Sequence, residues 1–136
     1  MLEHDRWDRD LVAQVHPRDW TNPLPAAKYD LVVVIVGMGS AGMTAAEFAA
    51  TLPIKVCGVE RDRVGGDCLW TGCVPSKALI SAARAWATAR HASGEHAGPP
   101  LGIGAQGDFA AMMDRMRRIR AGLSPIDSAS RFRQLG

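Results

Sequence analysis

The sequence predicts an α/β fold with a doubly wound parallel sheet, and three observations support this. Residues 29–36 (YDLVVVIV) form a continuous β-branched apolar run, which is the pattern of a strand buried on both faces of a parallel sheet. A glycine-rich turn and a helix-prone segment at residues 43–52 follow, and Pro53 ends that helix. A second short apolar run lies at residues 54–60. The order strand, turn, helix, strand predicts a β-α-β unit with a right-handed connection.

Composition excludes several classes of protein. The chain has 136 residues, enough for one domain, and its 47% hydrophobic and 22% charged residues are typical of a globular one. The net charge of +2 and the lack of a dense basic run argue against nucleic-acid binding. The longest apolar stretch is too short to span a bilayer, and residues 1–14 resemble neither a signal peptide nor an anchor. Three cysteines without an export signal predict a reducing, cytoplasmic location.

The N-terminal residues are predicted to form a lead-in to this domain. Residues 1–28 are rich in charge, tryptophan and proline, so we interpret them as irregular. Trp7 and Trp20 are expected to pack onto the domain, which then occupies residues 29–136.

After the β-α-β unit the chain is predicted to be mainly helical. An alanine-rich helix is expected at residues 76–93, followed by a loop at residues 94–107. Asp108 can cap the next helix, which runs to about Ala121, and Gly122 can end it.

The last predicted helix begins with Ser124 as its N-cap and Pro125 at its first helical position, and it extends to Leu135. No third strand is recognisable before Gly136. Since two parallel strands do not form a stable sheet alone, the chain is expected to be an apparently truncated part of a larger doubly wound domain.

A GMGSAG turn begins at Gly37 and has the G-x-G-x-x-G pattern in the context it needs, directly after a strand and before a helix. Gly37 permits the tight turn, Gly39 lets the backbone approach a pyrophosphate, and Gly42 lets the helix pack against the strand. A diphosphate would then lie beside Ser40 and Ala41, where unpaired helix amides favour negative charge. The turn therefore predicts a Rossmann-like dinucleotide site.

Glu60 strengthens this interpretation. It ends the second predicted strand, 18 residues beyond Gly42, where a carboxylate would meet the hydroxyls of an adenosine ribose. Arg61 beside it fits either contact with the dinucleotide or simple exposure to solvent. FAD and NAD both present an ADP moiety, so these residues alone do not distinguish them.

Cys68 and Cys73 lie five positions apart in GGDCLWTGCVPSK, and inert side chains, metal ligands and a redox pair are all open interpretations. A regular helix would hold their Cα atoms about 8–9 Å apart, whereas a disulfide needs less than about 7 Å. They can bridge only where the backbone departs from a helix, which Gly72 and Pro75 allow. Zinc is disfavoured because it needs about four ligands. Cys57, within the second predicted strand, is interpreted as a small hydrophobic residue.

The segment GGDCLWTGCVPSK closely resembles the redox motif of the class I flavoprotein disulfide reductases, which include glutathione reductase, dihydrolipoamide dehydrogenase and mercuric reductase. In that family the motif follows a G-x-G-x-x-G turn and a glutamate that ends a strand. The HPRDWTNP lead-in, the GGDC form and the stretch from RMRRIRAG to RFRQLG are most similar to the mercuric reductase-like branch. The resemblance covers nearly the whole chain.

The resemblance implies FAD as the cofactor and a role for each matching residue. Cys73 would be the charge-transfer thiol against the flavin, and Cys68 the interchange thiol that meets the substrate. Lys77 would approach flavin N5, and its charge would favour the Cys73 thiolate. Asp67 stands where many members have threonine, and a helix cap is its expected role. The cofactor-binding candidates are Gly37, Gly39, Ser40, Ala41, Gly42, Glu60, Arg61, Gly66, Asp67, Cys73 and Lys77.

The resemblance also implies a complete enzyme, a homodimer, that passes electrons from NAD(P)H to FAD, to the Cys68–Cys73 disulfide and then to a small-molecule disulfide or Hg(II). This chain is expected to be its N-terminal FAD-binding portion and not to turn over NADPH alone. The alternative is a stand-alone dinucleotide-binding or thiol-redox module.

Overall fold

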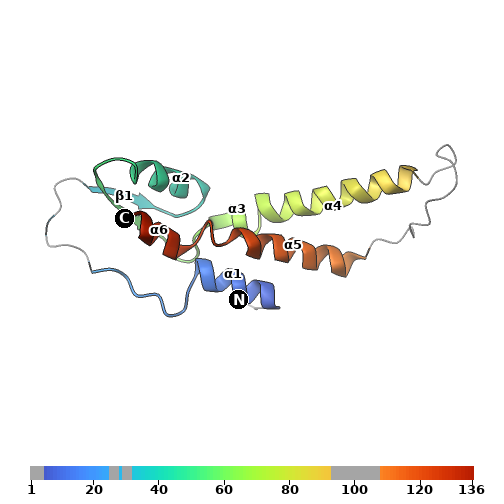
Figure 1. Ribbon diagram of the computed structural model, residues 1–136, viewed down its shortest axis with the longest axis horizontal. Helices are drawn as coiled ribbons and strands as arrows, with labels where there is room; N and C mark the ends of the chain where they lie inside the picture. The colour runs from blue at the N-terminus through green and yellow to red at the C-terminus, as the bar shows by residue number, and fades with distance from the viewer. Residues whose placement is uncertain (1–4, 25–27, 29–31, 93–107) are drawn as a thin grey trace.

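A small β-α-β unit forms one end of the molecule and helices form the rest (Figure 1). The computed structural model describes residues 5–24, 28, 32–92 and 108–136. In chain order its elements are α1 (Arg6–Val15), β1 (Val32–Val36), α2 (Ser40–Ala49), β2 (Lys55–Val59), α3 (Gly66–Trp70), α4 (Cys73–Ala92), α5 (Phe109–Leu123) and α6 (Ala129–Leu135).

The two strands confirm the predicted β-α-β order. β1 and β2 pair in parallel, with a register that runs from Val32 opposite Lys55 to Val36 opposite Val59. α2 contacts both strands. However, Val36 is 82% exposed, so the prediction that the first strand is buried on both faces is wrong. The physical reason is that, among the described residues, the sheet has only these two strands and α2 packs against them.

The N-terminal lead-in was predicted to be irregular, and this prediction is wrong, because residues 6–15 form the helix α1. Asp5 caps it by accepting hydrogen bonds from the backbone amides of Trp7 and Asp8. Its buried side chains recur every three or four residues, which is the helical period that the charged composition concealed. They are Asp8, Leu11, Val12 and Val15.

Both tryptophans of the lead-in pack onto the domain, as predicted. Trp7 lies partly buried against the hydrophobic core, and its Nε1 donates to Asp114 Oδ1 on α5 at 2.9 Å. The Arg133 guanidinium of α6 lies over the Trp20 ring, 4.3 Å from its centre, which is within cation–π distance.

The predicted helices after the sheet are confirmed with shifted ends. α4 begins at Cys73, three residues before the predicted start, and Pro75 is tolerated because it lies in the first turn. Asp108 caps α5 by accepting from the Ala111 amide at 3.0 Å. The predicted loop at residues 94–107 lies outside the described residues.

The predicted start of the last helix is wrong. Ser124 is the C-cap of α5, and its buried Oγ donates to the Ala121 carbonyl at 2.7 Å instead of capping a new helix. Ser128 is the N-cap of α6, because its Oγ accepts from the Arg131 amide at 3.1 Å. Two serines four residues apart offer similar local signals, and both are buried. They differ in backbone conformation: Ser124 is still helical, whereas Ser128 is extended, as is typical of an N-cap.

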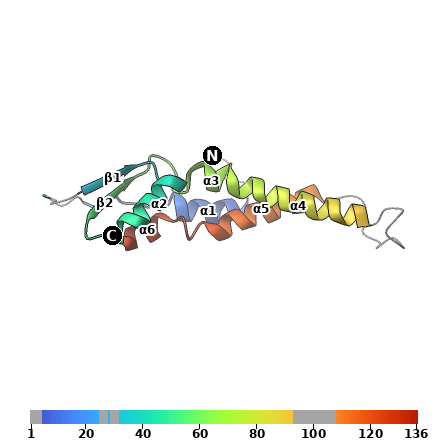
Figure 2. The same ribbon diagram turned by 90° about the horizontal axis from the view of Figure 1, so that it is seen from above.

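The hydrophobic core joins the N-terminal helix to the middle of the chain. α1 lies alongside α5 (Figure 2), and both contribute to one buried cluster with α2 and α3. The cluster contains Leu11, Val12, Val15, Met38, Met43, Ala46, Val64, Leu69, Trp70 and Ala121. Leu11 of α1 and Leu69 of α3 are almost completely buried, so both helices contribute to the centre of the core.

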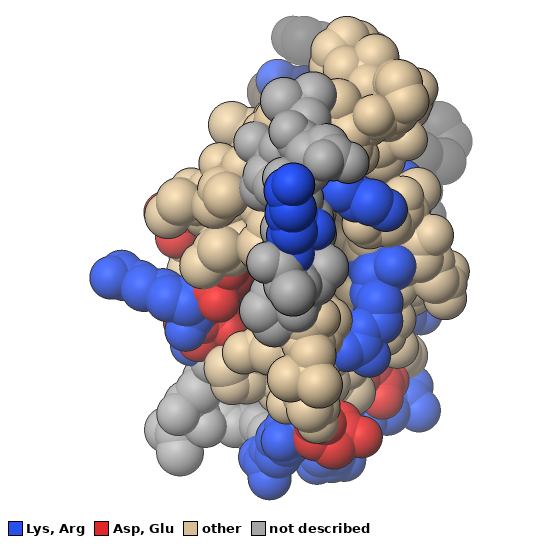
Figure 3. Space-filling view, turned by 90° about the vertical axis from the view of Figure 1, so that its left-hand side faces the viewer, with Lys and Arg blue, Asp and Glu red and all other residues tan. Residues whose placement is uncertain are grey.

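The surface carries charges of both signs. On the face shown in Figure 3, basic and acidic side chains are interspersed among uncharged residues, in agreement with the small net charge of +2. None of the helices in the described part of the chain combines the length and the apolar composition that crossing a bilayer requires.

Candidate functional site

The glycine-rich turn is held in a compact shape by its backbone. Gly37 has φ +92°, a left-handed conformation that favours glycine, and its amide donates to the Val59 carbonyl of β2 at 2.7 Å. A Cβ atom on Gly42 would lie 1.9 Å from the Gly37 carbonyl oxygen, so only glycine fits there. These two glycines let α2 start directly over the end of β1.

The same turn touches the segment that precedes the cysteines. The Gly65 amide donates to the Met38 carbonyl at 2.8 Å. A Cβ on Gly66, which has φ +53°, would lie 2.9 Å from the Gly39 Cα. Gly39 and Gly66 therefore bring two distant backbone segments into contact, and a side chain at Gly66 would separate them.

An open cavity of about 520 Å³ lies where these segments meet. It joins most of the glycine turn to the first turn of α3, and its lining residues are Ile35, Val36, Gly37, Gly39, Ser40, Ala41, Gly42, Asp67 and Cys68. Seven of these were predicted from the sequence. Ile35 and Val36 were not predicted, because the local sequence around an apolar strand residue does not show that the end of its strand faces a cavity.

The first turn of α2 fits a diphosphate group. Gly39 is the N-cap and supplies no side-chain hydrogen bond to the first helix amides. Ser40, Ala41 and Gly42 of that turn line the cavity. Amides without an intrahelical partner, together with the helix dipole, favour an anion at such a position. The backbone of the chain thus suits the phosphate end of a dinucleotide.

Glu60 lies behind this turn and does not line the cavity. Its Oε2 accepts from the Met38 amide at 2.8 Å, and its Oε1 accepts from the Asp62 amide at 2.9 Å. Burial raises the pKa of Glu60, but these amide hydrogen bonds outweigh it, and the pKa is lowered overall. The ionised carboxylate therefore ties the glycine turn to the end of β2. Arg61 is exposed beside it.

A break between two helices separates the cysteines. α3 ends at Trp70, α4 begins at Cys73, and the Thr71 and Gly72 amides both donate to the Asp67 carbonyl, at 3.0 and 2.6 Å. A Cβ on Gly72 would lie 2.8 Å from that carbonyl oxygen, so glycine is required at the break. The predicted departure from a regular helix is confirmed.

The two thiols contact each other across this break. Cys68 is partly buried and Cys73 is exposed, and both are free thiols. A hydrogen bond with the Cys73 side chain, followed by burial, raises the pKa of Cys68, and the charge of Asp127 adds to the effect. Cys57 is an exposed free thiol on β2. Within the described part of the chain, no three side chains of the metal-binding types gather at one point.

Two other predicted residues lie at the edge of the site. Asp67 lines the cavity but does not cap α3, so the predicted cap is wrong. The N-cap is Gly65, which has φ +94° and no side chain that could accept a hydrogen bond from the helix amides. Lys77 is exposed on α4, one helical turn beyond Cys73, and is not among the lining residues of the cavity.

Comparison with known proteins identifies relatives of this chain. The sequence model of the family described as pyridine nucleotide-disulphide oxidoreductase matches residues 31–130. The chain is 49% identical to a dihydrolipoyl dehydrogenase of Bacillus subtilis (strain 168) over 67 residues, and this alignment covers 49% of this chain and 14% of that protein. It is 39% identical over 100 residues to a dihydrolipoyl dehydrogenase of Chlamydia muridarum, covering 68% of this chain and 20% of the relative.

A similar match comes from a eukaryote. The chain is 42% identical over 93 residues to a dihydrolipoyl dehydrogenase of Trypanosoma brucei brucei, covering 68% of this chain and 19% of that protein. The chain thus spans about one fifth or less of the length of the curated relatives it matches.

Proposed function

The chain belongs to the pyridine nucleotide-disulphide oxidoreductase family, and we propose that it binds FAD at the glycine turn and opens and closes a disulfide between Cys68 and Cys73. The observation that carries this proposal is the cavity in which the turn and Cys68 meet. Members of this family use FAD with NAD(H), which makes a dinucleotide and a thiol pair at one site the expected combination.

The glycine turn would hold the diphosphate of FAD. Gly39 and the first turn of α2 supply backbone amides, and Gly37 and Gly42 keep side chains away from the phosphate path. Glu60 would support the turn from behind and, through its remaining lone pairs, accept from the adenosine ribose hydroxyls. When bound, FAD supplies a two-electron donor and acceptor beside the cysteines.

The two cysteines would carry the exchange with substrate. Oxidation of both thiols forms one S–S bond and releases two electrons and two protons; reduction reverses this. Cys68 retains its proton to higher pH, because its pKa is raised by the contact with Cys73 and by burial. We assign Cys68 to substrate exchange and Cys73 to contact with the flavin, and we place Lys77 beside the flavin as a cation.

The substrate is proposed to be a small dithiol or disulfide, because the named relatives are dihydrolipoyl dehydrogenases. An Hg(II) substrate is the second candidate, and only the similarity of the lead-in and the GGDC form to the mercuric reductase-like branch supports it. NAD(P)H as reductant, a homodimer and a cytoplasmic location complete the proposal for the whole protein.

Disulfide mapping tests the cysteine pair. The oxidised chain is alkylated, digested and analysed by mass spectrometry with and without reductant. We expect a Cys68–Cys73 bridge and an alkylated Cys57. A bridge that includes Cys57, or no bridge under mild oxidation, would exclude the proposed pair.

Ligand titration tests the nucleotide. We expect FAD to bind to the chain and ADP to compete with it, since the turn contacts the ADP end. Nicotinamide mononucleotide, which lacks the adenine half, is the control and should not compete. Failure of ADP to displace FAD would place the dinucleotide elsewhere.

A further inference from the structure

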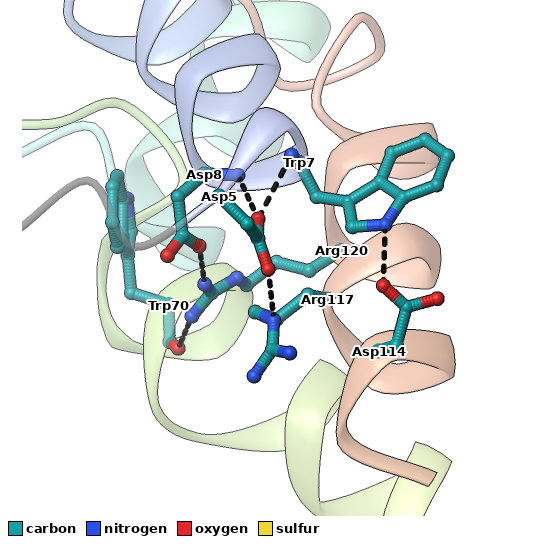
Figure 4. Close-up of polar contacts among 7 residues, drawn as sticks. All are labelled: Asp5, Trp7, Asp8, Trp70, Asp114, Arg117 and Arg120. Atoms are coloured by element: carbon teal, nitrogen blue, oxygen red, sulfur yellow. Dashed lines mark hydrogen bonds and ion pairs between the residues drawn. The ribbon is translucent and has the colours of Figure 1, made fainter. Parts of the chain in front are cut away.

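The carbonyl of Trp70, which lies between the two cysteines, is held by a residue from a distant helix (Figure 4). Arg120 of α5 donates from Nη1 to the Trp70 oxygen at 2.9 Å. Its second terminal nitrogen, Nη2, forms an ion pair with Asp8 of α1. Both charged side chains are largely buried, with 13% and 9% of their surfaces exposed. The guanidinium thus joins the N-terminal helix to the cysteine segment.

This carbonyl stands at the helix break on which the cysteine contact depends. Trp70 is the last residue of α3, and the final carbonyls of a helix lack intrahelical partners. In an uninterrupted helix the Trp70 oxygen would accept from the amide four residues ahead, and cysteines five apart would be too far to bridge. A side chain that donates to Trp70 from outside the helix therefore favours the broken path over the continuous one.

Asp8 fixes the position of Arg120. A buried guanidinium that loses its carboxylate partner keeps the desolvation cost without the compensating attraction, so it moves toward water when it can. The Arg120 guanidinium carbon also lies 5.4 Å from the centre of the Trp70 ring, and that of Arg63 lies 4.1 Å from the same ring. Trp70 is therefore held through both its carbonyl and its ring.

The helix that supplies Asp8 lies outside the matched family region, which is residues 31–130. α1 nevertheless contributes Leu11, Val12 and Val15 to the core and contacts α5 along its length. An element that the family match does not include is thus connected, through one arginine, to the segment that carries the thiols.

We propose that Asp8 and Arg120 are positioning residues that hold the break between α3 and α4 and thereby set the redox equilibrium of Cys68 and Cys73. The proposal rests on the proposed function of these cysteines. Neither residue touches a thiol; both act through the Trp70 carbonyl. Loss of the contact disfavours the geometry in which the disulfide forms, so the oxidised pair becomes less stable relative to the dithiol.

The chain offers a matched control pair. Arg117, one turn before Arg120 on α5, forms an ion pair with Asp5 at the start of α1. This pair joins the same two helices, and Figure 4 marks no hydrogen bond or ion pair between Arg117 and Trp70. Asn in place of Asp5 retains the helix cap, since asparagine is an equally good N-cap. Variants of Asp5 and Arg117 therefore test α1–α5 attachment alone.

The experiment is a redox titration of the full chain in dithiothreitol buffers, with the oxidised fraction of Cys68–Cys73 read by alkylation and mass spectrometry. We expect Asp8→Asn and Arg120→Lys to lower the equilibrium constant for disulfide formation about tenfold, equivalent to about 30 mV. Asp5→Asn and Arg117→Lys should change it less than about twofold. Arg120→Lys keeps a cation for Asp8 but lacks the planar fork that reaches two partners, so this variant is designed to fold.

Equal equilibrium constants in all four variants would overturn the proposal. If the native chain forms no Cys68–Cys73 bridge, the proposed function fails. Amide hydrogen exchange then tests the positioning role of Asp8 and Arg120 without the disulfide. Faster exchange at Thr71 and Gly72 in Asp8→Asn than in Asp5→Asn supports it, because both amides donate to the Asp67 carbonyl at the break. Identical exchange in these two variants overturns it.

Discussion

The two ends of the molecule are stabilised in different ways. The β-α-β end has exposed apolar strand residues, with Val34 at 57% and Val36 at 82% of their surface exposed. The helical end contains the most deeply buried side chains, including Leu11 and Leu69, and the buried Asp8–Arg120 pair. The structure of the β-α-β end depends on backbone conformation within short segments. The structure of the helical end depends on side chains that come together from distant parts of the chain.

This difference separates the two halves of the candidate site. The glycine turn is specified by residues within it, because Gly37 and Gly42 permit a shape that other residues do not. The cysteine segment is held by Arg120, which lies 50 positions from Trp70 and 112 from Asp8. Substitutions in each region should therefore act differently on folding and on binding.

The largest effect on stability is expected in the helical end. Leu11→Ala removes a side chain with no exposed surface and should lower the free energy of unfolding by about 2–5 kcal/mol. Thermal unfolding followed by circular dichroism measures this change. Leu24→Ala is the control, since Leu24 is 95% exposed, and it should shift stability by less than about 0.5 kcal/mol. Equal effects would mean that α1 does not belong to the core.

In the β-α-β end, Gly42→Ala should abolish FAD binding while costing less stability, about 1–3 kcal/mol, because the added Cβ overlaps the Gly37 carbonyl. Fluorescence titration and chemical denaturation measure the two effects. Gly122→Ala is the matched control. Apart from its chain neighbours and its own helix backbone, no atom lies within 4 Å of the added Cβ, so the change should stabilise the helix by about 0.5–1 kcal/mol. FAD binding that survives in Gly42→Ala would contradict the proposed role of the turn.

Glu60→Gln tests whether a charge supports the glycine turn. The pKa of Glu60 is lowered in the fold, so its contribution is present above about pH 4.5, the usual pKa of a glutamate, and is lost as the pH falls through the lowered native pKa. We expect a loss of about 1 kcal/mol at pH 7 that shrinks at acidic pH. Urea unfolding at pH 7 and at pH 3 measures it. Asp19→Asn, the same charge change at an exposed residue, is the control and should change the free energy of unfolding by less than about 0.5 kcal/mol.

The smallest effect concerns the end of the helical region. Ser128→Ala removes the N-cap of α6 and should cost about 1 kcal/mol. Ser130→Ala, within the same helix but exposed, should cost less than about 0.5 kcal/mol. Denaturant midpoints compare the two. If Ser130→Ala proves the more costly, the helix begins elsewhere.

Local chemistry made much of the fold and site predictable. The β-branched run at β1 and the GMGSAG turn predicted the parallel β-α-β unit, and Asp108 predicted the start of α5. α1 was not predicted, because its buried stripe is interrupted by charge, including the buried Asp8. The predicted cap at Ser124 is wrong because a local pattern does not show that α5 continues to Leu123.

The sequence by itself determined the glycine turn and the break between the cysteines. Gly37 is required by its positive φ, and Gly42 and Gly72 by clashes that a Cβ would make with backbone a few residues away. Only the tertiary structure decided that α1 packs on α5, that Glu60 holds the turn from behind, and that Arg120 reaches Trp70. The physical reason is range. Steric limits on φ and ψ act within a few residues, whereas burial and ion pairing depend on which distant side chains the fold brings together.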